Sequence, residues 1–174
     1  RCYPFIEGTV CLQNAETPEL FAASGRAFGR FQRELSGYSA DTLYETIPHF
    51  HDTEDRLAKL RAAVAADSEG RVAEVGPELA FVNAREGDCS VALQALREGK
   101  LPLRVTHNDT KLNNVLIDRE SGEGICVIDL DTVMPGLSIN DFGDSIRFGA
   151  NDNEEDEPDQ SKVHFNLGLY EVYT

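Results

Sequence analysis

The sequence predicts an α+β domain that is mainly helical and contains one short β-hairpin. Two amphipathic stretches within the first 70 residues repeat their apolar side chains with the period of a helix. After residue 103 the pattern changes to short apolar runs separated by a polar turn with a glycine, which is typical of antiparallel strands. At 174 residues the chain fits a single domain. We therefore expect one helical lobe with a small hairpin in its middle.

The first predicted helix begins at Thr17-Pro18-Glu19. Threonine is a favoured N-cap residue, proline fits the first turn because no N–H is needed there, and an acid suits the positive end of the helix dipole. The helix is expected to end near Gly37. Its core-facing stripe follows at helical spacing and consists of Leu20, Ala23, Ala27, Phe28, Phe31 and Leu35.

Three further helices are predicted before residue 100. One begins near Thr53 and ends before Ser68, and its inward side chains are Leu57, Leu60 and Val64. Two shorter helices cover about 77–86 and 89–98, with Gly87 between them.

A β-hairpin is predicted after a brief extended segment at 103–106. Its strands cover 114–118 and 124–128, and the polar residues between them form the turn. A hairpin brings the start of its first strand close to the end of its second strand. We therefore expect Asn114 to lie opposite Asp129.

The residues around this hairpin are of the types that phosphoryl transfer needs. The run from His107 to Asn114 reads His-Asn-Asp-Thr-Lys-Leu-Asn-Asn. Asp109 is a candidate base for the acceptor hydroxyl, and Lys111 is a candidate positive charge beside the transferred phosphate. Asn114 and Asp129 supply an amide and a carboxylate oxygen, which are ligands that Mg²⁺ prefers. The sequence thus predicts half of a kinase active site.

Structural interpretations compete with this one. Aspartate and asparagine are common in turns, and Lys111 has the alternative of a simple surface lysine. His107 is expected to orient the loop rather than to react. The string Asp141-Phe-Gly resembles the metal motif of protein kinases, but it follows an additional turn at 134–136. Asp141 is therefore expected to cap a helix and to brace the loop, whereas Asp129 takes the metal role.

Three runs of the sequence resemble the aminoglycoside phosphotransferase and choline kinase superfamily, with the nearest match to N-acetylhexosamine 1-kinases. These runs are 106–115, 126–136 and 141–147. The resemblance implies the C-terminal lobe of a protein-kinase-like fold. Residues 1–10 would be the hinge strand and the end of the N-terminal lobe, and residues 11–174 the helical C-terminal lobe. Because the chain opens on arginine, we expect it to be part of a longer protein whose N-terminal lobe is missing here.

The resemblance also implies a reaction and its residues. Such a kinase would transfer the γ-phosphate of ATP to the anomeric hydroxyl of GlcNAc or GalNAc. Asp109 would be the catalytic base, Asn114 and Asp129 would hold Mg²⁺, and Asp131 would lie near the phosphates or the sugar. The adenine would lie beside Pro4, Phe5 and Ile6. The 174 residues alone are expected to be inactive, because the phosphate loop and its lysine belong to the N-terminal lobe.

Other functions stay open at this point. A kinase of the same fold for choline, another amino alcohol or an aminoglycoside would carry the same catalytic residues, and a non-catalytic binding module would share the fold. A sulfatase acting on mucin sugars is a further alternative, which needs the motif C-x-P-x-R. Cys2-Tyr-Pro4 begins that motif, but Ile6 stands where the arginine is required.

Composition limits the partners and the location. A net charge of −15 opposes binding to nucleic acid or to an anionic membrane, and no apolar run approaches the roughly 18 residues of a membrane-spanning helix. Four cysteines without a C-x-x-C pair indicate reduced thiols and a cytoplasmic setting. The acidic run 151–159 is expected to be a solvated loop. A small-molecule sugar substrate remains the expected partner.

Overall fold

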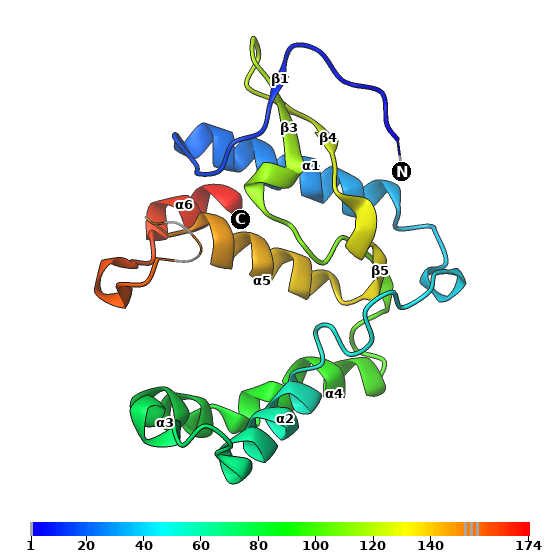
Figure 1. The fold of residues 1–174 in the computed structure, drawn as a ribbon. Helices are drawn as coiled ribbons and strands as arrows, with labels where there is room; N and C mark the ends of the chain where they lie inside the picture. The colour runs from blue at the N-terminus through cyan, green and yellow to red at the C-terminus, as the bar shows by residue number, and fades with distance from the viewer. Residues whose placement is uncertain (1, 152, 154, 156) are drawn as a thin grey trace. The chain divides into compact units, whose positions relative to one another are not determined.

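The computed structural model describes residues 2–151, 153, 155 and 157–174 of the chain. They form two compact units, one made of Arg1–Thr46 with Arg104–Thr174 and the other of Ile47–Leu103. Figure 1 shows that helices are combined with short strands along the chain. The strands form two small antiparallel sheets, which confirms the predicted mixture of helices with a little β structure.

Helix α1 (Pro18–Glu34) begins where the sequence predicts it. Thr17 Oγ1 accepts a hydrogen bond from the Leu20 N–H at 3.3 Å, and the helix ends at Glu34, with Leu35 as its C-cap, shortly before Gly37. Its apolar stripe packs on the hairpin in a core cluster of Ala23, Ala27, Phe28, Val115 and Ile117. The helix therefore supports the hairpin that carries the candidate metal ligands.

The predicted hairpin is present and belongs to a three-stranded sheet. Its strands β3 and β4 are antiparallel, with Val115 opposite Val127, and β1 pairs with the other edge of β3. The bounds of these strands are Thr9–Val10 for β1, Val115–Asp118 for β3 and Gly124–Val127 for β4. The chain before α1 is thus joined directly to the hairpin.

A second sheet corrects the turn that was predicted at 134–136. Met134–Gly136 forms strand β5, which pairs antiparallel with β2 (Arg104–Thr106). Met-Pro-Gly resembles a turn by local rules, and Pro135 has no N–H to donate. In a two-stranded sheet both strands are edges, where proline is tolerated.

Of the strand predicted over residues 1–10, only the last two residues form a strand, β1. Residues 2–6 lie in neither a helix nor a strand, and pairing begins at Thr9, opposite Asp118. Tyr3 is 66% exposed and Phe5 is 88% exposed. An extended segment becomes a strand only where a neighbour accepts its backbone hydrogen bonds, and no such neighbour reaches these residues in the described chain. Arg1 lies outside the described residues.

Helix α5 (Ser138–Gly149) begins four residues earlier than a cap at Asp141 would place it. Its N-cap is Leu137, so Asp141 stands within the first turn and does not cap the helix. The prediction of a cap at Asp141 is therefore wrong. The early start follows from strand β5, which delivers the chain to Leu137 in an extended conformation.

A short C-terminal helix, α6 (Leu167–Tyr173), was not predicted from its apolar sequence. Asn166 caps it by accepting the Leu169 N–H at 3.1 Å. Its apolar side packs against α1 and α5, and the buried residues of this second core cluster are Phe21, Ala150 and Leu169. Figure 1 shows α6, in red, beside α1 and next to the C-terminal end of α5.

We expect Gly149→Ala to destabilise this second cluster by about 1–3 kcal/mol, because overpacking strains a close-packed core. A Cβ at position 149 would overlap Cε2 of Phe21, a side chain that is only 1% exposed. Thermal unfolding would measure the loss. The matched control is Gly143→Ala on the same helix, where a Cβ meets no atom within 4 Å. Equal unfolding temperatures for the two variants would contradict the packing described.

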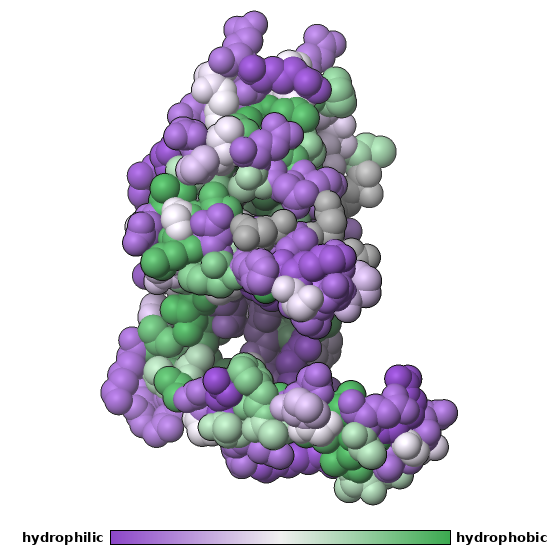
Figure 2. All heavy atoms as spheres, turned by 90° about the vertical axis from the view of Figure 1, so that its left-hand side faces the viewer, coloured by the Kyte–Doolittle hydropathy of each residue, from purple (hydrophilic) through white to green (hydrophobic). Residues whose placement is uncertain are grey.

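The second unit contains the three further helices that the sequence predicted before residue 100. They are α2 (Thr53–Ala66), α3 (Gly76–Ala84) and α4 (Val91–Arg97). Gly87 lies in a 3₁₀ turn between the last two, as its sequence position predicted. None of the described residues of these helices is fully buried. On the face drawn in Figure 2, hydrophobic side chains reach the surface among hydrophilic ones.

Several sequence predictions concern features outside the two cores. None of the helices in the described part of the chain combines the length and apolar character needed to cross a bilayer. All four cysteines are free thiols. The predicted acidic loop 151–159 includes three acids that lie outside the described residues, namely Asp152, Glu154 and Asp156. Its described acids Glu155 and Glu157 form ion pairs.

Candidate active site

The loop from His107 to Asn114 brings three of the predicted site residues together. Asn114 Nδ2 donates to Oδ2 of Asp109 at 3.0 Å and to the Asp109 backbone oxygen at 2.9 Å. Lys111 Nζ lies 3.5 Å from Asp109 Oδ1. The candidate base is therefore positioned by an amide on one carboxylate oxygen and by an ammonium group on the other.

The contacts of Asn114 fix the direction of its amide. Both groups that Nδ2 approaches are oxygens, so the nitrogen must face Asp109, and Oδ1 is left for a cation or another donor. The Asn114 carbonyl accepts the Ile128 N–H at 2.9 Å. The backbone of Asn114 thus pairs with Ile128, whereas the sequence predicted that Asn114 would lie opposite Asp129, the next residue.

Asp129 follows strand β4 at the mouth of the hairpin, with an exposed carboxylate. Its φ of 58° lies in the left-handed region, which is uncommon outside glycine and often occurs at functional sites. No group of three or more His, Cys, Asp or Glu side chains suited to a metal occurs in the described part of the chain. The donor types of Asn114 and Asp129 nevertheless fit Mg²⁺, which is commonly held by one or two protein oxygens and by substrate phosphates.

Asp141 braces the loop from helix α5, as the sequence predicted. Its Oδ2 accepts the His107 N–H at 3.0 Å and its Oδ1 accepts the Asn108 N–H at 2.8 Å, while Gln32 donates to Oδ2. Asp141 is only 4% exposed. Burial raises the pKa of its carboxyl, and the hydrogen bonds from His107 and Asn108 oppose that shift only in part. Both oxygens of the carboxylate are therefore used by the loop backbone, and one of them also by Gln32.

Two further residues of α5 hold the loop and were not predicted. Asp144 Oδ2 accepts the Thr110 N–H at 2.9 Å, and Ser145 Oγ donates to the Thr110 carbonyl oxygen at 2.9 Å. Both stand three or four residues after Asp141, on the same face of the helix. That spacing was the available signal. Once Asp141 is known to face the loop, the spacing predicts that Asp144 and Ser145 face the loop as well.

His107 orients the loop, which confirms the prediction. It is fully buried, its Nε2 lies 2.9 Å from the Ile128 carbonyl oxygen, and its Nδ1 accepts the Asp109 N–H at 3.3 Å. These partners assign the proton to Nε2 of a neutral ring. The ring packs edge-on against Phe28 and Phe31, with centroids 5.5 and 5.8 Å away. His107 thus connects the core under α1 to the residue that carries the base.

The turn after the hairpin adds a third support. Asn108 Nδ2 donates to the Thr132 carbonyl oxygen at 3.0 Å, and Thr132 Oγ1 donates to the His107 carbonyl oxygen at 2.7 Å. Asn108 has a φ of 66°, a conformation that asparagine adopts more readily than most residues. The loop is consequently fixed from α5, from the hairpin and from the turn after it.

Comparison with protein families identifies the family to which a chain with this loop belongs. The model of the phosphotransferase enzyme family, APH, matches residues 1–173. The chain belongs to this family. Membership confirms the predicted reaction class, and it agrees with a loop that places a carboxylate between an amide and an ammonium group. Kinases of the APH family typically use ATP and Mg²⁺.

Lys111 remains charged in this phosphotransferase. Its Nζ lies 3.0 Å from Glu155 Oε2 in addition to its contact with Asp109. Burial lowers the pKa of the ammonium, but the carboxylates of Glu155 and Asp109 outweigh burial, and the pKa is raised. A cation next to the base suits the transfer of a phosphoryl group, which carries negative charge.

The residues predicted to contact adenine take no part in these contacts. Pro4 and Phe5 are exposed, and the Ile6 carbonyl oxygen accepts a hydrogen bond from Thr9 Oγ1 at 2.8 Å. In the described part of the phosphotransferase chain, no hydrogen bond or ion pair joins Pro4, Phe5 or Ile6 to the loop at Asp109. Their role at a hinge stays a prediction.

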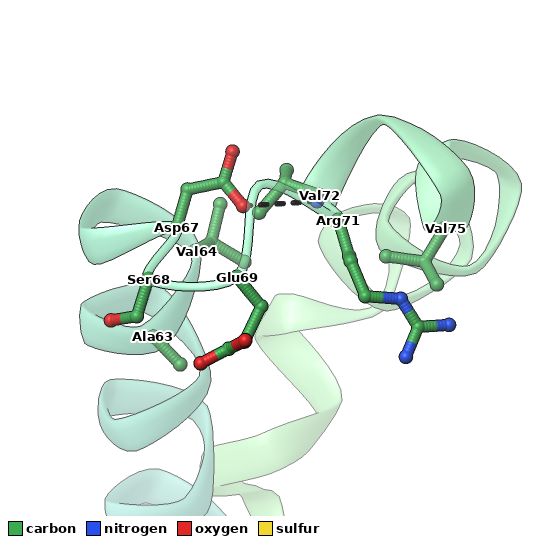
Figure 3. A pocket seen from close by; sticks show the side chains of 8 residues that line it. All are labelled: Ala63, Val64, Asp67, Ser68, Glu69, Arg71, Val72 and Val75. Atoms are coloured by element: carbon green, nitrogen blue, oxygen red, sulfur yellow. Dashed lines mark hydrogen bonds between the residues drawn. The ribbon is translucent and has the colours of Figure 1, made fainter.

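The second unit contains a hollow of about 440 Å³ that includes none of the predicted site residues. It lies where α2 ends and the following turn begins, and Figure 3 shows the Asp67 carboxylate hydrogen-bonded to the Val72 amide at its edge. None of the residues that line it was predicted to act in phosphotransfer. They are Ala63, Val64, Asp67, Ser68, Glu69, Arg71, Val72 and Val75.

Proposed function

We propose that the protein transfers the γ-phosphate of ATP to the anomeric hydroxyl of an N-acetylhexosamine, GlcNAc or GalNAc. The observation that carries the proposal is the 3.0 Å hydrogen bond from Asn114 to Asp109 within a loop that α5 braces. The family match supports phosphotransfer. The choice of sugar is supported by the resemblance of 106–115 and 126–136 to N-acetylhexosamine 1-kinases.

Asp109 acts as the base in this reaction. Its carboxylate accepts the proton of the acceptor hydroxyl as the new O–P bond forms and the bond to the β-phosphate oxygen breaks. Asn114 donates a hydrogen bond to Oδ2 of Asp109 and so fixes the direction of the carboxylate. Lys111 stabilises the negative charge of the transferred group from the other side.

Asn114 Oδ1 and the Asp129 carboxylate would hold Mg²⁺ together with the phosphates of ATP. When bound, the ion neutralises charge on the phosphate oxygens. Asn114 thereby has two tasks, since its nitrogen orients the base and its oxygen is available as a ligand. Pro4 to Ile6 would lie beside the adenine, and the net charge of −15 suits a small-molecule partner better than nucleic acid.

A coupled assay of ATP consumption, run on the full-length protein, tests the proposal with a panel of acceptors. We expect turnover with GlcNAc or GalNAc, and none with the 1-O-methyl glycoside of the same sugar, because its anomeric oxygen has no proton to give to Asp109. Choline and an aminoglycoside complete the panel. Turnover with either of them, and none with the two hexosamines, would contradict the acceptor. If the protein consumes no ATP with any acceptor of the panel, the proposed reaction is contradicted and the non-catalytic binding module is favoured.

A further inference from the structure

Glu155 lies between two cations that come from different elements. Its Oε2 is 3.0 Å from Lys111 Nζ, and its Oε1 is 2.9 Å from Nη1 of Arg147. Lys111 belongs to the loop that carries Asp109, and Arg147 belongs to helix α5. Two positive charges, of which Lys111 lies beside the base, thus converge on one carboxylate that takes no part in the proposed reaction.

Arg147 is oriented by its own helix. Its Nε and Nη2 lie 3.1 and 2.9 Å from Oδ1 of Asp144, which leaves Nη1 directed to Glu155. The other oxygen of Asp144 accepts the Thr110 N–H of the loop. The guanidinium plane is rigid, so fixing one edge also fixes the direction of the remaining donors. The direction of Arg147 Nη1 is therefore set by Asp144 as well as by Glu155.

The surroundings of Glu155 favour an anion. Burial raises the pKa of its carboxyl, but hydrogen bonds and charges from Lys111 and Arg147 outweigh burial, and the pKa is lowered. The carboxylate uses both of its oxygens, one on each cation. A phosphate group has the same kind of acceptor oxygens, with one more of them and up to about one more unit of charge.

We propose that Lys111 and Arg147 form an oxyanion site for a phosphate group, and that Glu155 occupies this site in the absence of phosphate. The proposal deepens the proposed function and rests on it, because that function places the transferred phosphate next to Asp109. Lys111 Nζ, 3.5 Å from Asp109 Oδ1, makes the site adjacent to the base. Arg147 is the added cation, and Glu155 is an internal competitor that phosphate displaces.

Titration with inorganic phosphate, followed by calorimetry at constant ionic strength, measures this competition without any turnover. We expect Glu155→Gln to bind phosphate about fivefold tighter than the unchanged protein, which corresponds to about 1 kcal/mol. Glu157→Gln is the matched control, because it removes the same charge from the same segment while its partner is Lys162. The control is expected to bind phosphate like the unchanged protein.

The contribution of Arg147 is measured in the Glu155→Gln background. Adding Arg147→Gln is expected to cancel the gain in phosphate affinity. The control is Arg26→Gln, which removes an exposed arginine that pairs with Glu123 and is expected to keep the gain in phosphate affinity. Arg147→Lys keeps the charge without the fork and should restore part of the binding. Circular dichroism of each variant separates a loss of binding from a loss of fold.

Equal phosphate affinities for Glu155→Gln and Glu157→Gln would overturn the proposal, and so would a gain that survives Arg147→Gln. The outcome is distinguishable from a failure of the proposed function. Tighter phosphate binding by Glu155→Gln in a protein that phosphorylates no hexosamine would support the site and reject the acceptor. Hexosamine turnover with unchanged phosphate binding would support the acceptor and reject the site.

Discussion

Replacing Asp109 by asparagine is expected to lower kcat by about 10²–10⁴-fold, the usual contribution of a general base. Asparagine has nearly the same size, and its side-chain oxygen still accepts the bond from Asn114 Nδ2 that holds the carboxylate in place. What it lacks is the basic oxygen that faces Lys111. The initial rate of ATP consumption with the hexosamine acceptor measures the effect.

The control for Asp109→Asn is Asp41→Asn, the same chemical change at an exposed position of the 3₁₀ turn Ala40–Thr42. It is expected to keep the kcat of the unchanged protein. Thermal unfolding of both variants shows whether the fold is retained. A folded Asp109→Asn protein with an undiminished kcat would contradict the role of Asp109 as the base.

Asp141→Ala is expected to lower the free energy of unfolding by about 3 kcal/mol or more. The change leaves the N–H groups of His107 and Asn108 buried without their acceptor, and each such loss costs about 1–3 kcal/mol. Gln32 loses its partner as well. Chemical denaturation measures the loss, and kcat should fall too, because the loop that carries Asp109 is no longer braced.

Asp118→Ala is a matched control, since the Asp118 carboxylate also accepts three hydrogen bonds. They come from the amide of Glu120 at 3.2 Å and from the amide and hydroxyl of Ser121 at 2.8 Å each, in an exposed turn. Water replaces lost partners there, so the loss of stability should be much smaller. Similar losses for Asp118→Ala and Asp141→Ala would contradict a buried brace.

Local signals explain the elements that the sequence predicted well. The Thr17 cap and the apolar period located α1, and the polar turn between two apolar runs located β3 and β4. Each of these signals lies within a few residues of the element that it specifies. The same local rules misjudged 134–136, because β5 exists only through its pairing with β2, about 30 residues away in sequence.

The candidate site divides in a similar way. The residue types of Asp109, Lys111 and Asn114 indicated their chemistry, and the structure brings them into contact. The supports of Thr110 by Asp144 and Ser145 cross more than thirty residues, and their spacing from Asp141 becomes a signal only once Asp141 is known to face the loop. Glu155 was expected in a solvated loop, and its ion pairs depend on where α5 directs Arg147. The Mg²⁺ ligands and the adenine contacts stay predictions.

The distance in sequence between the loop and α5 has a consequence for the order of folding. The amides of His107, Asn108 and Thr110 find their acceptors only on residues 141–144. Closing a segment of that length costs chain entropy before any of these bonds forms, so contacts within α1 or within the hairpin can form sooner. We therefore expect refolding to restore the helices first and the geometry around Asp109 late, so that the return of helix signal should precede the return of catalytic competence.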